Sequence, residues 1–492
     1  RILLLVNYDV DGVCACKILQ TLFRCDNTLY TLVPVQGTQD LVESYFKHVE
    51  QIKIILMVNC GGNIDIVETL QPDEEIIFFI IDSHKPTDIC NIYSSEQVRL
   101  LGKPDREEWI PEFSDIFYDE GNDRKTKRRK LDEGAIMKQR ERRMWKENRN
   151  RLMFEYTQFS FYGRSSSMII FDILWQLGKD SADALWWAIV GVTYQIVFGL
   201  IDEQRYSNEL AVLQLHMSRL LTNEPGNENG IRNATPTLKI TNNSLHLALY
   251  RHWTVQSSLR NSLCTAIKLR LWTMRGEKHL QQLLAEIGLP LSESKQRFCS
   301  MDISLRQDFL SMMEKAAENY EIDDLIYTSF TLSYGYRSSY QASDYVYGLL
   351  ALMDVSSRNK QMGSCFSDAL DSLARSKSDL LEVGIEGAKK ILCCIFRHVQ
   401  GLLDMKQIIA TGPFLYFALQ EGSLDVRMFA QAHFLTMLAR CSLRAYHSVS
   451  RSKRSSCLPL VASAPAYPEN DACIIIGIPP VSEVIPRKYV CA

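Results

Sequence analysis

The sequence predicts an α/β protein with a parallel sheet in its N-terminal part, a helical middle part and a second α/β part near its C-terminal end. Three observations support this fold class. Short apolar runs alternate with amphipathic stretches in the first 90 residues, polar residues follow directly after these runs, and three further apolar runs come after a long helical region. Fully apolar strands separated by helices are typical of a parallel sheet that is covered on both faces.

The N-terminal elements follow from hydrophobic periodicity. Four runs are apolar enough to be buried strands, and they span residues 2–6, 30–35, 52–58 and 76–81. Apolar residues recur at helical spacing over residues 13–23, where Ile18, Leu19, Leu22 and Phe23 share one face, and again over residues 41–49. Strand and helix therefore alternate along the chain, as in an open α/β sheet.

The pattern changes after residue 100. Residues 115–123 are acidic and residues 124–130 are basic, and residues 135–155 read as a long, polar, Arg-rich helix. We interpret this region as an exposed insertion. The sheet domain then resumes with a turn and an amphipathic helix over residues 161–177, followed by a helix over residues 182–193.

The second half of the chain begins after a break rich in Asn, Gly and Pro at residues 222–237. Helical patterns cover residues 245–320, 341–354 and 364–404, and strands are predicted over residues 412–419, 457–464 and 472–480. The predicted domains are a sheet domain in two parts (1–110 and 156–225), an exposed insertion (111–155), a helical interdomain (226–365) and a C-terminal α/β domain (366–492).

Composition excludes several classes of protein. The net charge of −3 points to no particular partner, and the 14 cysteines form no C-x-x-C pair, so we expect buried, reduced thiols rather than zinc sites or disulfides. The longest apolar stretch, residues 185–200, is interrupted by Thr193, Tyr194 and Gln195. It is also shorter than the roughly 20 residues that a membrane span needs. We therefore expect no membrane partner.

Polar side chains mark the carboxyl ends of the predicted strands. Asp9, Asn59 and Asp82 each follow a strand, Asp11 stands two residues after Asp9, and His84 stands two residues after Asp82. In an open α/β sheet the ligand crevice lies outside these strand ends. The sequence therefore predicts a polar pocket at this edge.

Two interpretations of the aspartate pair remain open. Asp-x-Asp at a strand-to-helix turn can hold Mg²⁺ or Mn²⁺, and two such ions can clamp the oxygens of a phosphoryl transfer. Alternatively, Asp9 caps the following helix and complements its dipole. In that second case the pocket serves the fold, and Asp11→Asn, which keeps an oxygen able to cap, is expected to cost little stability.

Seven short motifs carry a family resemblance. DVDG (9–12), VNCG (58–61), DSHKP (82–86) and GRSSS (163–167) follow the order found in the DHH phosphoesterase superfamily, which includes the RecJ nucleases. With LWWAIVG (185–191), TGPFLY (411–416) and IIIGIPP (474–480), the chain closely resembles the cell division control protein 45 family of eukaryotic replication forks. The resemblance implies a RecJ-like DHH domain, a helical interdomain and a C-terminal domain similar to the superfamily's DHHA1 domain.

The chain departs from the active members of that superfamily at three ligand positions. Asn59 stands where they carry an aspartate, Ser83 stands in place of a histidine, and Tyr194 lies near the expected position of a last aspartate. The resemblance therefore implies a vestigial pocket without a catalytic residue, a metal ion or a cofactor. Its residues are Asp9, Asp11, Asn59, Asp82, Ser83, His84 and Tyr194.

The resemblance implies a non-enzymatic subunit of the replicative DNA helicase. Such a subunit bridges the Mcm helicase ring and the GINS complex during initiation and fork progression, and the helicase activity resides in those partner subunits. It also implies contacts with a replisome polymerase, initiation factors, and single-stranded or forked DNA. The rival hypothesis is a metal-dependent single-strand nuclease of the RecJ type.

Two further features bear on nucleic acid and on localisation. The stretch YGYRSSY (334–340) is a weak indication of base stacking in a single-strand binding module.

Residues 124–130 are almost all basic, a composition that indicates a nuclear-import signal. A solvated helix face and direct contact with nucleic acid remain alternative interpretations. The candidate import residues are Lys125, Lys127, Arg128, Arg129 and Lys130. The expected location is the nucleus.

Overall fold

The computed structural model describes residues 1–49, 52–94, 96–102, 108–117, 133–222, 237–322, 325–334, 338–358, 360–420, 422, 425–450, 457–466 and 472–481. These residues form two compact units. The first contains Arg1–Asn7 and Thr28–Arg164, and the second contains Tyr8–Asn27 and most of the chain from Ser165 onward. The five-part division predicted from the sequence stays a prediction.

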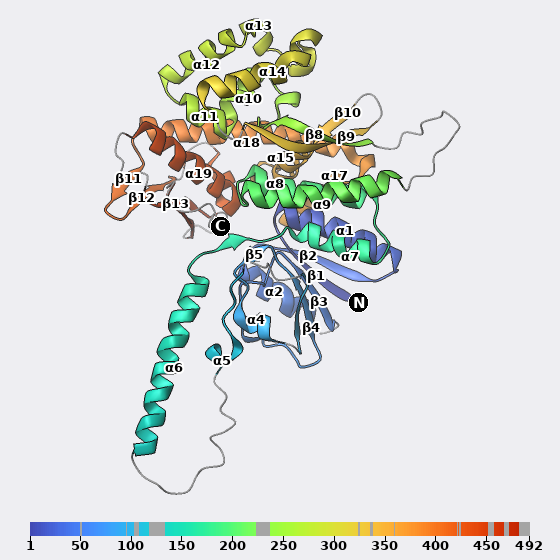
Figure 1. The fold of residues 1–492 in the computed structure, drawn as a ribbon, viewed down its shortest axis with the longest axis vertical. Coiled ribbons are helices and arrows are strands. Elements are labelled where there is room, and N and C mark those ends of the chain that lie inside the picture. Colours follow the sequence, from blue (N-terminus) through green and yellow to red (C-terminus); the bar gives the residue numbers. More distant parts are fainter. Residues whose placement is uncertain are drawn as a thin grey trace, which may run out of the picture. The chain divides into compact units, whose positions relative to one another are not determined.

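The first unit is built on a five-stranded parallel sheet with the strand order β2-β1-β3-β4-β6 (Figure 1). The strands are β1 (Ile2–Asn7), β2 (Tyr30–Val35), β3 (Ile54–Val58), β4 (Ile77–Ile81) and β6 (Val98–Leu100). All four strands predicted for this part are confirmed. Strand β6 adds a short edge that the sequence analysis did not identify.

The same unit contains five helices among its described residues. They are α2 (Thr38–His48), α3 (Ile66–Leu70), α4 (Ile89–Tyr93), α5 (Phe113–Ile116) and α6 (Glu133–Thr157). Of these, α2, α3 and α4 lie between strands of this sheet in the sequence, and α5 and α6 follow its last strand. A two-stranded ribbon pairs β5 (His84–Lys85) with β7 (Phe161–Tyr162). The long polar helix predicted in the insertion corresponds to α6.

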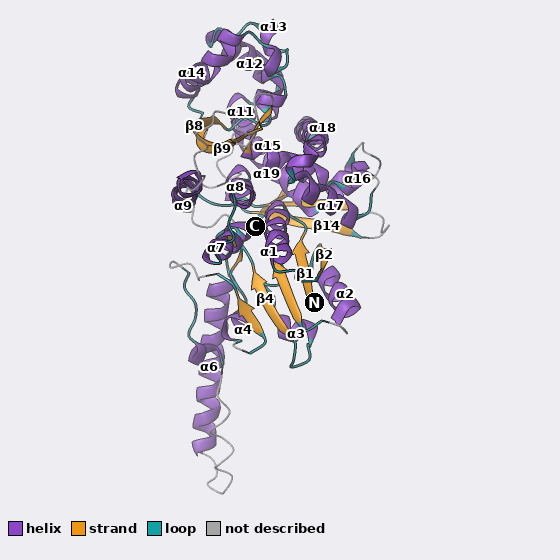
Figure 2. Cartoon of the chain, turned by 90° about the vertical axis from the view of Figure 1, so that its right-hand side faces the viewer, coloured by secondary structure: helices purple, strands orange, loops and turns teal. Residues whose placement is uncertain are grey.

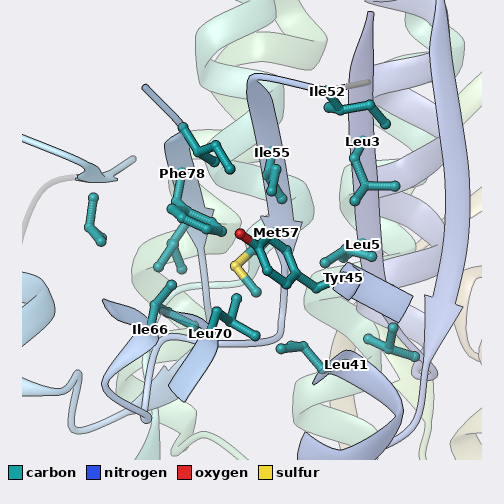
Figure 3. Packing of buried hydrophobic residues seen from close by; sticks show 14 residues of the cluster. Leu3, Leu5, Leu41, Tyr45, Ile52, Ile55, Met57, Ile66, Leu70 and Phe78 are labelled. Carbon is teal, nitrogen blue, oxygen red and sulfur yellow. The ribbon is translucent and has the colours of Figure 1, made fainter. Parts of the chain in front are cut away.

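A hydrophobic core lies between the sheet and the helices α2 and α3 (Figure 3). The strands contribute alternate residues such as Leu3 and Leu5, because successive side chains of a strand point to opposite faces. Helix α2 contributes Tyr45, and α3 contributes Ile66 and Leu70. Burying each large apolar side chain contributes about 1.5–3 kcal/mol, so this core fixes the positions of the strand ends.

The second unit begins with α1 (Val10–Cys25), which packs against several other helices of that unit. The helices around it are α7 (Ser166–Gln176), α8 (Ala182–Val197), α15 (Ala342–Leu352) and α17 (Met362–Ser372). Tyr8 lies two residues before α1, and its hydroxyl donates a hydrogen bond to the Met353 carbonyl at 2.9 Å. Further helices are α9 (Glu203–Thr222), α16 (Val355–Arg358), α18 (Ser378–Asp404) and α19 (Ala432–Val449).

Besides α15, α16 and the beginning of α17, the described residues of the predicted helical interdomain (226–365) contain five further α-helices, and also a sheet. The helices are α10 (Val255–Asn261), α11 (Leu263–Leu269), α12 (Met274–Glu286), α13 (Leu291–Ser294) and α14 (Ile303–Tyr320). The antiparallel sheet has the order β10-β9-β8, from β8 (Thr237–Leu245), β9 (Ile326–Tyr334) and β10 (Ser338–Gln341). The sequence analysis missed this sheet because β8 is interrupted by polar residues and its register shifts between Thr241 and Ser244.

The C-terminal part of the second unit contains a four-stranded sheet with the order β11-β12-β13-β14, drawn in orange in Figure 2. Its strands are β11 (Ile409–Thr411), β12 (Phe414–Ala418), β13 (Leu460–Pro465) and β14 (Cys473–Ile478). The three predicted strands are confirmed, and α19 packs against β13 and β14. None of the helices in the described part of the chain is both long and apolar enough to span a membrane.

Candidate functional site

Asp9 is the N-cap residue of α1. Its backbone is extended, with φ −137° and ψ 167°, and its carboxylate accepts a hydrogen bond from the Gly12 backbone N–H at 2.5 Å. The first N–H groups of a helix have no partner within the helix, and an aspartate at this place satisfies one of them. The capping role considered in the sequence analysis is therefore what the geometry shows for Asp9.

Asp11 is almost fully buried, with 1% of its surface exposed, and it binds the beginning of α7. One carboxylate oxygen accepts from the Ser165 hydroxyl at 2.5 Å and from the Ser167 N–H at 3.1 Å, while the other accepts from the Ser166 N–H at 2.8 Å. Ser165 is the N-cap position of α7, so Asp11 supplies the partners that this helix start lacks. A buried carboxylate is well satisfied by such charge-assisted hydrogen bonds.

Helix α8 approaches this network at Gly191. A Cβ atom on Gly191 would lie 2.0 Å from the Ser167 Oγ and 2.7 Å from the Asp11 Oδ1, so a larger residue does not fit without displacement. Tyr194, another residue of the predicted pocket, follows about one helical turn later. It is half-buried, and its ring centroid lies 5.4 Å from that of Phe198.

In the first unit, Asp82 joins two strand-end loops. Its side chain is 4% exposed and accepts from the Gly62 N–H at 2.9 Å, from the His84 N–H at 2.9 Å and from the His84 Nδ1 at 2.7 Å. Gly62 belongs to the loop after β3, and Asp82 follows β4. A Cβ on Gly62 would come within 2.7 Å of the Asp82 carboxylate, so the glycine permits the contact.

Asn59 and Ser83 form a buried neutral pair beside that contact. The Asn59 side-chain oxygen accepts from the Ser83 N–H at 3.1 Å and from the Ser83 hydroxyl at 3.0 Å. Asn59 has a left-handed backbone with φ +52°, a conformation that asparagine adopts more readily than most residues. The neutral side chains of Asn59 and Ser83 therefore satisfy each other, and they add no charge beside the Asp82 carboxylate.

The predicted pocket residues thus occur in two groups. The structure brings Asn59, Asp82, Ser83 and His84 together in the first unit. Asp9, Asp11 and Tyr194 belong to the second unit, on α1 and α8. The sequence analysis did not identify the partners of the aspartates, although the GRSSS motif contains three of them.

One group of possible metal ligands was not predicted. Among the described residues, Asp65, Asp88 and Cys90 have ligand atoms within 4.8 Å of one another. Both aspartates already cap short helices, because Asp65 accepts from the Glu68 N–H and Asp88 accepts from the Cys90 N–H. Burial and the two neighbouring carboxylates raise the pKa of Cys90 to about 12, which keeps its thiol protonated near neutral pH.

The suggested stacking motif at residues 334–340 does not offer Tyr340 to nucleic acid. Tyr340 is 4% exposed, and its ring lies against His252 with a centroid distance of 5.5 Å and an interplanar angle of 12°. Tyr340 is therefore packed inside the second unit, with its ring stacked on His252. The candidate import residues at 125–130 lie outside the described residues.

The parallel sheet, with polar groups after its strands, defines an α/β protein of the class that the sequence predicts. A family model described as CDC45 matches residues 2–118 and 103–486. The chain belongs to the CDC45 family.

Relatives and one solved structure support this assignment. The chain is 38% identical to the cell division control protein 45 homologs of Mus musculus and Homo sapiens, over 99% of this chain and 89% of each of theirs. Identity to the Schizosaccharomyces pombe homolog is 27%, over 96% of this chain and 85% of that protein. The crystal structure of CDC45 from Entamoeba histolytica has the same fold, with a TM-score of 0.71 at 20% identity, covering 98% of this chain and 84% of that one.

Proposed function

We propose that this chain is a non-enzymatic subunit of the eukaryotic replicative DNA helicase. In this role it bridges the Mcm ring and the GINS complex during initiation and fork progression, and it guards single-stranded DNA at the fork. A replisome polymerase and initiation factors are further partners, and the protein acts in the nucleus. Membership of the CDC45 family supports this proposal, since its relatives are named for the control of cell division.

The observation that carries the non-enzymatic part of the proposal is that the pocket carboxylates are hydrogen-bonded to groups of the protein itself, beside two neutral side chains. The Asp11 oxygens accept three hydrogen bonds from residues 165–167, and Asp82 accepts three from Gly62 and His84. Asn59 and Ser83 add no negative charge to balance a second dication. A two-metal mechanism needs several anionic ligands, and the neutral Asn59 and Ser83 supply none, so the nuclease hypothesis has little support from these groups.

An activity assay tests the proposal against the nuclease hypothesis. Purified protein is incubated with end-labelled single-stranded DNA and Mg²⁺ or Mn²⁺, with a RecJ nuclease as positive control. We expect no cleavage above background. Cleavage that EDTA stops and that His84→Ala abolishes, in a variant that melts like the parent chain, would overturn the non-enzymatic assignment; His84 is the partly exposed member of its pair with Asp82.

A reconstitution tests the assembly. Tagged full-length chain is mixed with the Mcm proteins and GINS subunits of the same organism, and the affinity-purified complex is identified by mass. We expect recovery of both partners, together with ATP-dependent unwinding of a forked duplex. Recovery of neither partner would contradict the proposed function.

A further inference from the structure

Positive charge gathers where α11 meets α12 in the second unit. Arg270 is the C-cap residue of α11, and Arg275 and Lys278 lie in the first turns of α12. All three side chains are exposed. Together with Met274, which is 87% exposed, they form what we call the α11–α12 basic surface.

Backbone packing brings the two segments of this surface together. Arg270 has a left-handed backbone with φ +51°, and the Thr273 hydroxyl donates to its carbonyl at 2.9 Å. A Cβ on Gly276 would lie 2.1 Å from that same carbonyl oxygen, so the first turn of α12 rests directly on the backbone of Arg270. The cations of α12 are therefore neighbours of Arg270 and do not belong to a separate patch.

No acidic side chain within the α11–α12 basic surface neutralises its positive charges. The acid within its sequence, Glu277, forms an ion pair with Arg260 instead. Across the described parts of the chain, no ion pair involves Arg270, Arg275 or Lys278.

This arrangement opposes two general preferences. Arg275 and Lys278 are three residues apart on one helix face, where like charges repel, and both lie near the positive end of the helix dipole. The chain as a whole carries a net charge of −3, so its general composition does not account for the cluster. An anionic partner would offset both costs.

The chemistry of the surface favours a protein partner over nucleic acid. Single-stranded nucleic acid is bound by exposed aromatic rings between cations, but the aromatic residue of this segment, Trp272, is 4% exposed. Met274 is instead an exposed, flexible apolar side chain, a type enriched at protein interfaces. We infer that the α11–α12 basic surface docks an acidic protein segment that also covers Met274.

This inference deepens the proposed function, because it places the acidic segment on a subunit of the helicase assembly. The test variant is full-length chain carrying Arg270→Glu, Arg275→Glu and Lys278→Glu, and a second variant carries Met274→Glu alone. The matched control reverses three exposed lysines outside the surface: Lys239→Glu, Lys315→Glu and Lys390→Glu. Circular dichroism melting of all variants checks that they fold like the parent chain.

Binding is measured by titrating each labelled variant with purified Mcm proteins and with GINS separately, at two NaCl concentrations. We expect the triple variant to bind one of the two partners about tenfold or more weakly, with a smaller salt dependence than the parent chain. Met274→Glu should weaken binding to the same partner, and the control should bind like the parent chain.

Three outcomes separate the possibilities. Equal binding by the triple variant and the control would overturn the inference. Loss of affinity for a 30-nucleotide single strand, with unchanged binding to both protein partners, would also overturn it and assign the surface to nucleic acid. If the parent chain itself binds neither partner, the proposed function fails, which is a different result from a selective effect of the variant.

Discussion

At the scale of single residues, the aspartates of the predicted pocket have structural roles. Asp9 caps its own helix, and Asp11 reaches the start of a helix 154 residues further along the chain. Asp82 ties the loop after β3 to the end of β4. These aspartates satisfy backbone N–H groups and a serine hydroxyl, which gives their presence in the sequence a structural reason.

The geometry of Asp11 changes the expectation for Asp11→Asn. The sequence suggested a small cost, but both oxygens accept hydrogen bonds, so the amide NH₂ must face a backbone N–H or a serine hydroxyl. We expect the free energy of unfolding to fall by about 2–3 kcal/mol, which chemical denaturation measures. The control Asp9→Asn keeps an oxygen for the Gly12 N–H and should cost less than about 0.5 kcal/mol. Equal stability of the two variants would refute the role assigned to Asp11.

Gly191 provides a second test of the same network. Gly191→Ala places a methyl group against Ser167 and Asp11, and we expect it to destabilise the protein by about 1–3 kcal/mol. Gly401→Ala, within α18, meets no atom within 4 Å and should instead stabilise by about 0.5–1 kcal/mol. Adding Ser167→Ala to Gly191→Ala should recover part of the loss, since it removes the nearest atom. A Gly191→Ala protein as stable as the parent would show that α8 can move away.

At the scale of secondary-structure elements, α1 combines a polar start with an apolar body. Its first turn holds both aspartates, and the following residues are buried against other helices of the second unit. Burial raises the pKa of Cys16 to about 12, and burial together with Asp11 and Asp9 raises the pKa of Cys14 well above its usual value. The same helix ends in Cys25, which is exposed.

These differences predict selective alkylation along one helix. At pH 8 a thiol with a pKa of about 12 is ionised to about one part in 10⁴, and burial also blocks access, so Cys14 and Cys16 should not react with iodoacetamide in the native protein. Cys25 should react within minutes. Peptide mass spectrometry measures both, and unfolding in guanidinium should make all three react. Native modification of Cys14 at the rate of Cys25 would contradict the packing of α1.

At the scale of the whole molecule, the two units are not continuous in sequence. The chain passes from one unit to the other after Asn7, Asn27 and Arg164. Within the second unit, hydrogen bonds join distant segments, such as the Tyr8 hydroxyl to Met353 and the Trp187 indole to the Leu373 carbonyl at 3.1 Å. Contacts between such distant segments require the closure of long loops, which costs chain entropy, so we expect slow folding for this topology.

The proposed nuclear location gives a prediction for the whole protein. Replacing Lys127, Arg128, Arg129 and Lys130 with alanine should abolish the nuclear accumulation of a fluorescent fusion, because short basic clusters are read as import signals. Quantitative imaging measures the ratio of nuclear to cytoplasmic signal. The control replaces Arg140 and Arg143 on the exposed face of α6 and should leave the ratio unchanged. Normal accumulation of the first variant in cells depleted of its partners would disprove the import role.

The sequence by itself determined the α/β class, most strand positions and the family. Apolar runs report burial, and burial with alternating helices is enough to predict a parallel sheet with Asp9, Asn59 and Asp82 at its strand ends. The motifs then specified the family, which the comparisons confirm.

Only the tertiary structure decided what the polar residues contact. Asp11 and Ser165 are far apart in sequence, and the close approach at Gly191 depends on how α8 packs, so no local pattern reveals either. The sheet of β8, β9 and β10 was missed for the same reason, since its mixed polar strands are stabilised by pairing with one another and with buried neighbours. Local sequence determines which residues become buried. Their hydrogen-bonding and packing partners belong to distant chain segments that only folding brings together.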